Sequence, residues 1–264
     1  MLDQRKQKEA EYYDSHAQKW LRANSGNSFK GDFEGFVPLS LASYRFCYQQ
    51  LAGNCSGKTV LDYGCGNGIH AIFLAKTGAE KVIGIDLSEK SLEIAKLVAY
   101  KEGVEDKVEF RQMDCEKMSF PDNSFDVVFD GGTFSSLDLD KSFSEIARVL
   151  RSDGVLIGIE TLGHNPLTNL KRKLNQLVGK RTDWAVSHIF KLADIEKARQ
   201  YFSETKVSFF HIISWAFFPL LRLPGARVVL KLLEGADEVL FRIKPLKRYA
   251  FKVVFIFSRP FKRQ

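Results

Sequence analysis

Short apolar runs alternate with amphipathic stretches of helical length through the middle of the chain. The runs 58–63, 81–86, 108–113 and 125–130 are rich in branched and aromatic side chains, which is typical of strands. Helical periodicity follows the first run over 69–76, and Ser88 is a candidate helix cap after the second. This alternation predicts one doubly wound α/β domain with a mostly parallel sheet.

A glycine turn joins the first predicted strand to its helix. Glycines occupy alternate positions from Gly64 to Gly68, and they let backbone approach a ligand where any Cβ would clash. The third glycine comes too early for the G-x-G-x-x-G fingerprint of dinucleotide sites. Asp62 stands two positions before the first glycine, where its carboxylate suits a cationic ligand. The turn therefore predicts a ligand site at the carboxyl end of this strand.

The run from Val60 to Gly68 resembles the first motif of the class I S-adenosylmethionine-dependent methyltransferases. That motif has two hydrophobic residues, an acid, any residue and then Gly-x-Gly-x-Gly, and this sequence matches it at every position. The resemblance implies that Asp62 pairs with the amino end of the methionine moiety. It also implies that the turn borders the cofactor through Gly64, Cys65, Gly66 and Gly68.

Acidic residues end the later strands as well. Asp86 ends the second strand, where a carboxylate is placed to accept both hydroxyls of a ribose, and a solvated strand end is the alternative. The resemblance makes Leu87 a neighbour of the adenine. It makes Asp114 the acceptor for the adenine amino group, helped by the backbone amide of Cys115, and it adds Asp130 at the end of the fourth strand to the cofactor site.

The resemblance covers residues 56 to 160 and implies a Rossmann-like seven-stranded sheet, mostly parallel with an antiparallel last strand and helices on both faces. An Asp153–Gly154 turn leads into the fifth strand, and 205–212 and 250–257 suit the sixth and seventh. The expected parts of the chain are an N-terminal helical cap over 1–56, a core over 57–213 and 250–264 that contains an insertion at 161–189, and a helical insertion over 214–249.

Positive charge gathers near the carboxyl end of the chain. The formal net charge is +7, and the residues from Lys206 onward hold 12 Lys or Arg and 3 acids, which leaves −2 for residues 1–205. The uncharged stretch 207–221 is shorter than the about 20 residues that a membrane span needs. Residues 226–242 predict an amphipathic helix. Its expected apolar face contains Val229, Leu232, Leu233, Ala236, Val239 and Leu240.

Two interpretations of this basic, aromatic insertion stay open. The helix packs on its own domain with a solvated basic face, or it serves as a substrate lid or a membrane-surface element that recruits a lipophilic substrate. Nucleic acid is not expected as a partner, because no RNA-binding module is recognisable.

Two residues are candidates for catalysis. His164 leaves the fifth strand at the edge where α/β sheets bind ligands, and its ordinary pKa suits a general base. The alternative is a loop histidine that bonds its own turn. Tyr13, in the amino-terminal stretch 9–20 that resembles a leader helix over the cofactor, is a candidate substrate contact, and packing on the core is its alternative.

The cysteines and the amino terminus bear on metal sites and location. Cys47, Cys55, Cys65 and Cys115 have no metal-ligand spacing, and no metal is expected. The first residues are polar and lack the apolar segment of a secretory signal. We therefore expect a cytoplasmic protein, with peripheral membrane contact left open.

The expected activity is transfer of a methyl group from S-adenosylmethionine to a small, hydrophobic acceptor, with oxygen the first choice of atom and carbon the second. A lipid or quinone methyltransferase at the membrane surface is one alternative. A non-catalytic cofactor-binding module is another. No Asn-Pro-Pro-Tyr motif follows Asp130, which argues against methylation of amide nitrogens and nucleobase amines. The acceptor's identity and the oligomeric state are not predicted.

Overall fold

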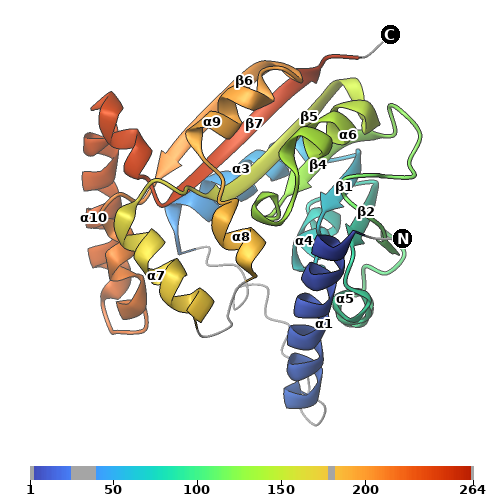
Figure 1. Ribbon diagram of the computed structural model, residues 1–264, viewed down its shortest axis with the longest axis horizontal. Helices are drawn as coiled ribbons and strands as arrows, with labels where there is room; N and C mark the ends of the chain where they lie inside the picture. The colour runs from blue at the N-terminus through green and yellow to red at the C-terminus, as the bar shows by residue number, and fades with distance from the viewer. Residues whose placement is uncertain (1–2, 25–39, 178–181, 263–264) are drawn as a thin grey trace.

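A seven-stranded sheet organises the chain. The structure is a computed structural model that describes residues 3–24, 40–177 and 182–262 (Figure 1). The strands are β1 (Thr59–Tyr63), β2 (Lys81–Asp86), β3 (Val108–Gln112), β4 (Phe125–Asp130), β5 (Leu150–Thr161), β6 (Phe202–Phe210) and β7 (Lys252–Pro260). Their order is β3-β2-β1-β4-β5-β7-β6, with β7 antiparallel to both of its neighbours and the other pairs parallel. This confirms the predicted fold class.

Helices cover both faces of the sheet because successive strand residues point to opposite sides. Val60 lies in a hydrophobic cluster with α3 (Ala42–Cys55), α4 (Ile69–Lys76) and α5 (Glu89–Lys101). Its neighbour Leu61 lies in a second cluster with α6 (Leu139–Val149) and α9 (Leu192–Ala198). The strands therefore have two buried faces, as their almost uninterrupted apolar sequences indicate.

The remaining helices lie at the edges of this sandwich. Helix α1 (Gln4–Asn24) packs on α5, and α7 (Pro166–Leu177) and α8 (Asp183–Ser187) follow β5 (Figure 1). Between β6 and β7 come the 3-10 helix η2 (Ser214–Leu220), α10 (Ala226–Leu240) and the 3-10 helix η3 (Lys244–Tyr249). Within the described ranges, no helix combines the length and apolarity that a bilayer crossing requires.

One local prediction was wrong. Asp153 and Gly154 do not form a separate turn before the fifth strand: they lie inside β5, where the pairing with β4 changes register between Phe125 and Val127. The structure also bears on the two open interpretations of α10, because the expected apolar face is largely exposed. Val229, Leu232 and Val239 face solvent, and the buried positions of α10 are Ala226, Leu230, Glu234 and Asp237.

Candidate functional site

The glycine turn forms the floor of a cavity of about 220 Å³ at the carboxyl edge of the sheet. Gly64, Gly66 and Gly68 all have positive φ. A Cβ at Gly64 would lie 2.4 Å from the Thr133 side chain, so glycine is required there by space as well as by conformation. The cavity is lined by Lys6, Glu9, Ala10, Tyr13, Gly64, Gly66, Asp86, Leu87, Cys115, Gly131, Gly132, Thr133, Ser136 and Leu137.

Asp86 points its carboxylate into this cavity with its orientation fixed by backbone amides. One oxygen accepts from the amide of Gly66 at 2.9 Å and the other from the amide of Ser88 at 2.8 Å. Burial raises the pKa of Asp86, and these amides oppose that rise. Each oxygen keeps a lone pair, so the group can accept two further hydrogen bonds from neighbouring hydroxyls.

Asp62 lies behind the glycine turn and is fully buried. Neither carboxylate oxygen has a hydrogen-bond partner of good geometry, although the amide of Ala71 lies near enough to lower the pKa. Burial dominates and raises the pKa of Asp62 to about 8. A buried carboxylate without a partner is costly. Asp62 does not line the cavity, but it stands two residues before Gly64, which does, and a cationic ligand group that reached it would complete it.

A second buried acid, Asp130, ends β4 beneath the loop 131–137. One of its oxygens accepts from the amide of Thr133 at 2.9 Å, and the other has no hydrogen-bond partner. Burial and the nearby carboxylate of Glu160 raise its pKa. Glu160 accepts from the amide of Phe134 at 2.8 Å. The two acids thus hold the loop that lines one side of the cavity, and Asp130 itself does not line it.

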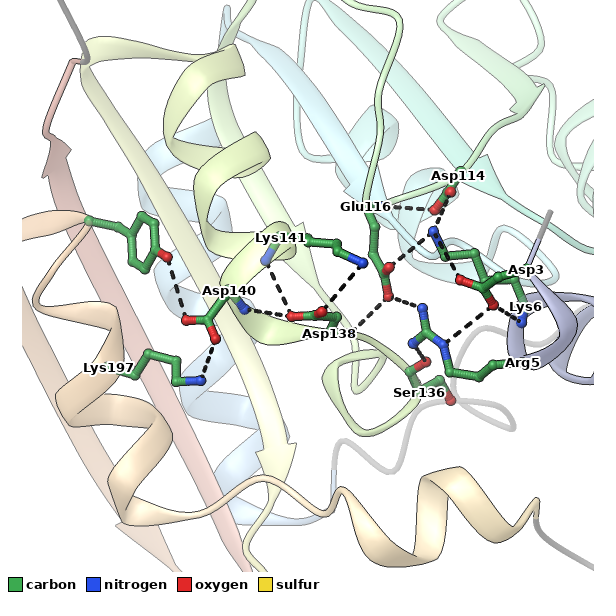
Figure 2. Close-up of polar contacts among 11 residues, drawn as sticks. Asp3, Arg5, Lys6, Asp114, Glu116, Ser136, Asp138, Asp140, Lys141 and Lys197 are labelled. Carbon is green, nitrogen blue, oxygen red and sulfur yellow. Dashed lines mark hydrogen bonds and ion pairs between the residues drawn. The ribbon is translucent and has the colours of Figure 1, made fainter. Parts of the chain in front are cut away.

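Helix α1 is fastened over the cavity by ion pairs. Lys6 Nζ lies 2.6 Å from Asp114 and 3.0 Å from Glu116, and Arg5 lies 2.5 Å from Glu116 (Figure 2). Glu116 also accepts from the amide of Asp138 at 2.7 Å. Asp114, the expected adenine partner, is therefore held by Lys6 next to the cavity. Cys115, beside it, lines the cavity.

The two catalytic candidates have different surroundings. Tyr13 lines the cavity and is half exposed. His164 does not line it: its Nε2 accepts from the amide of Leu192 at 3.1 Å, at the start of α9. Burial lowers the pKa of His164. The lone pair that a general base needs is occupied, so the geometry favours the alternative of a structural loop histidine.

Several residues around the site were not singled out by the sequence. Lys6, Glu9 and Glu116 become neighbours of the cavity only when α1 folds over it, and no local motif marks them. His70 was passed over as an ordinary helix residue, yet its ring packs against Gly131 and one ring nitrogen hydrogen-bonds the Tyr48 hydroxyl. Burial lowers the pKa of His70 to about 4 and keeps the ring neutral.

The sequence and the fold were compared with those of known proteins. Residues 61–158 match the methyltransferase domain family, and this match spans β1 to β5 with the glycine turn, Asp86 and Asp114. Residues 61–158 are therefore similar in sequence to a methyltransferase domain. The chain's similarity to solved structures extends further. A geranyl diphosphate C-methyltransferase from Streptomyces coelicolor superposes with a TM-score of 0.64 and 15% identity, covering 97% of this chain and 98% of that one.

Other similar proteins differ in what their names say they act on. A sterol 24-C-methyltransferase of Aspergillus fumigatus is 31% identical over 208 residues, which are 70% of this chain and 55% of that protein. A ubiquinone biosynthesis O-methyltransferase of Bordetella pertussis is 35% identical over 161 residues, 61% of this chain and 63% of that protein. The chain spans between about a quarter and just under two thirds of such relatives. A [4+2]-cyclase, with a TM-score of 0.54 and 20% identity over 83% of this chain and 82% of that one, shares the methyltransferase fold.

The residues of the domain fit S-adenosylmethionine. The unpartnered carboxylate of Asp62 suits an ammonium group, and Asp86 suits a ribose diol. A Cβ at Gly66 would project into open space on the cavity floor, so that glycine leaves room for a bound group. These three observations come from independent positions in β1, in the turn and in β2.

Proposed function

We propose that this protein transfers a methyl group from S-adenosylmethionine to a small lipophilic acceptor. The observation that carries the proposal is the pair of acids at the glycine turn, Asp62 without a partner and Asp86 held open toward the cavity. When bound, the cofactor supplies a methyl group on a positively charged sulfur. The protein has to bind and orient both reactants and exclude water between them.

Different residues in and around the cavity bind different parts of the cofactor. Asp86 orients the ribose and Asp62 the ammonium group, while Asp114 and the amide of Cys115 border the adenine. Leu87 and the side chains of α1 line the side of the cavity that faces the glycine turn. Because Lys6 holds Asp114 and Glu116 together, the same ion pairs that close α1 also fix the adenine end of the site. Closure of this kind excludes water from the reacting groups.

The acceptor side of the site is proposed to lie between α1 and α8. A second, more open cavity of about 380 Å³ lies there, and Glu9 lines both cavities. Glu9 is buried, accepts from the Thr182 hydroxyl through one oxygen, and has no hydrogen-bond partner for the other. Such a carboxylate can orient an acceptor hydroxyl and accept its proton, which supports oxygen as the first choice of acceptor atom and carbon as the second.

The acceptor class is inferred from the relatives. Sterol, ubiquinone and geranyl diphosphate methyltransferases are named for acceptors that carry long apolar groups. The protein's own acceptor is proposed to be of that lipophilic kind. A non-catalytic cofactor-binding role is the competing proposal, since the acids at the glycine turn would serve cofactor binding without any transfer.

The test is transfer of labelled methyl from S-adenosylmethionine to a lipid extract, followed by mass spectrometry of the labelled product. Wild-type protein is expected to label an apolar product, and Glu9→Gln to lower the rate by about 10²-fold or more with unchanged cofactor affinity. Glu11→Gln makes the same chemical change on the exposed side of α1, so it serves as the matched control. Cofactor binding without labelling of any extract would favour the binding module. Equal rates for Glu9→Gln and wild type would remove the assigned role of Glu9.

A further inference from the structure

Helix α10 is attached to the domain through two acids as well as through the buried side chains of Ala226 and Leu230. Glu234 accepts from the amide of Ala42 at 2.6 Å and pairs with Arg45 at 2.8 Å. Asp237 accepts from the amides of Ile213 and Ser214 at 2.8 and 3.3 Å. Both acids are buried. These contacts fix which side of the helix faces inward, and the apolar side is left outside.

Exposed apolar side chains recur along the outward side of α10. The exposed fractions are 65% for Val228, 71% for Leu232 and 58% for Val239. These positions recur at helical spacing, so they share one side of α10. Nine of the fourteen exposed large hydrophobic residues in the described chain belong to 213–249, and together they define what we call the α10 face: Ile213, Leu220, Leu223, Val228, Val229, Leu232, Val239, Ile243 and Tyr249. A concentration of this kind marks an interaction surface.

Unpaired positive charge surrounds the α10 face. Seven basic residues lie between 213 and 249, and no ion pair to them occurs among the described residues: Arg222, Arg227, Lys231, Arg242, Lys244, Lys247 and Arg248. Of the three acids in this segment, Glu234 and Asp237 are turned inward, so Glu238 alone is exposed. On α10 itself, Arg227 and Lys231 lie along one border of this apolar side, at helical positions next to it.

We propose that the α10 face binds peripherally to the surface of an anionic lipid bilayer. An apolar strip bordered by cations is the pattern of helices that lie in a membrane interface, with the apolar side in the acyl boundary and the cations at the phosphates. A second copy of the chain fits less well, because a two-fold contact through this face would bring the same seven cations together. The binding is independent of the proposed methyl transfer and adds a membrane partner to it.

The position of α10 is compatible with this arrangement. In Figure 1 the helix lies at one end of the molecule, and α1, which lines the cofactor cavity, lies toward the other. Contact of the α10 face with a bilayer therefore leaves α1 and the cofactor cavity uncovered. Binding to lipid and binding to S-adenosylmethionine can then be measured separately on the same protein.

The test is flotation of the full chain with vesicles of phosphatidylcholine alone or mixed with phosphatidylglycerol. Binding is expected only to the anionic vesicles and is expected to weaken with added salt. Arg227→Glu and Lys231→Glu should each lower the partition constant about fivefold or more, and Leu232→Ser should also lower it. The matched controls lie on α5: Tyr100→Ser, whose side chain is 70% exposed, and Lys96→Glu.

Several results would overturn the proposal. These are failure of the wild-type protein to float, equal flotation with neutral vesicles, or flotation that all three α10 variants retain. Light scattering on the same samples tests whether a second copy of the chain binds the α10 face instead. A wild-type dimer that dissociates in the Leu232→Ser variant would assign the face to such a contact. Titration with S-adenosylmethionine should give the same affinity in every variant, so loss of flotation is separable from failure of the cofactor site.

Discussion

Replacing Glu116 by Gln tests whether buried ion pairs hold α1 over the cofactor cavity. The Glu116 side chain is fully buried, with Arg5 at 2.5 Å and Lys6 at 3.0 Å. Gln keeps the shape and the acceptor for the Asp138 amide but removes the charge that both cations face. Removing one partner of a buried pair costs about 3–5 kcal/mol. If α1 detaches from the cavity, Arg5 and Lys6 are hydrated again, and the energetic cost is relieved. We therefore expect the substitution to shift the equilibrium toward the detached state of α1 rather than to unfold the domain.

The lower figure of about 3 kcal/mol corresponds to an opening equilibrium about 100-fold larger. Amide hydrogen exchange, followed by mass spectrometry, should show this acceleration over residues 4–24 and leave β1, β4 and β5 unchanged. Glu109→Gln is a matched control, since Glu109 also pairs with two cations, Arg111 and Lys81, but its side chain is 42% exposed. An exposed pair contributes about 0–1 kcal/mol. Equal exchange of α1 in both variants would refute the ion-pair account of closure.

Three further predictions follow from buried groups. The pKa of Asp62 in the free protein is about 8, and only its ionised form attracts the ammonium group of the ligand. The affinity for S-adenosylmethionine, measured by titration calorimetry, should therefore rise up to about tenfold per pH unit between pH 6 and pH 8. The Asp62→Asn variant should show no such rise. Burial lowers the pKa of His211 to about 3, below the value of about 6.5 expected in the unfolded chain. The free energy of unfolding should therefore be highest above about pH 6.5 and fall as the pH is lowered, by about 2 kcal/mol at pH 5. Urea unfolding of His211→Asn should lose that pH dependence, and an unaltered dependence would contradict it. His164→Ala should lower stability by about 1 kcal/mol, through loss of its bond to the Leu192 amide, and keep full turnover in a methyl-transfer assay. A large loss of turnover would restore His164 as the base.

The sequence predicted the sheet well because strand burial and the glycine turn are local signals. The apolar run of β1 and the glycines from Gly64 to Gly68 are contiguous, and the acids that end β1 and β2 follow directly from them. The orientation of α10 could not be predicted, and this has a physical reason too. Helical periodicity reveals that a helix has two sides, but Glu234 and Asp237 bind partners up to 192 residues away, and those partners decide which side faces the core.

The placement of α1 over the cavity could not be predicted from the sequence either. Lys6 and Asp114 are 108 residues apart in sequence, and neither stands in a motif that indicates the other. His164 illustrates a choice between two roles that the sequence left open. Its position after β5 suited a base, whereas the structure uses its lone pair to accept from the start of α9. Residues whose role depends on packing between distant elements need the folded structure before a role can be assigned.

Titration calorimetry with S-adenosylmethionine, on wild-type protein and on Asp86→Asn, tests the cofactor site most directly. The predicted result is one site per chain, weakened about 10-fold or more by the substitution, because a charged acceptor facing the ribose is lost. NAD, titrated in parallel, should not bind. Tight binding of NAD without binding of S-adenosylmethionine would contradict the account.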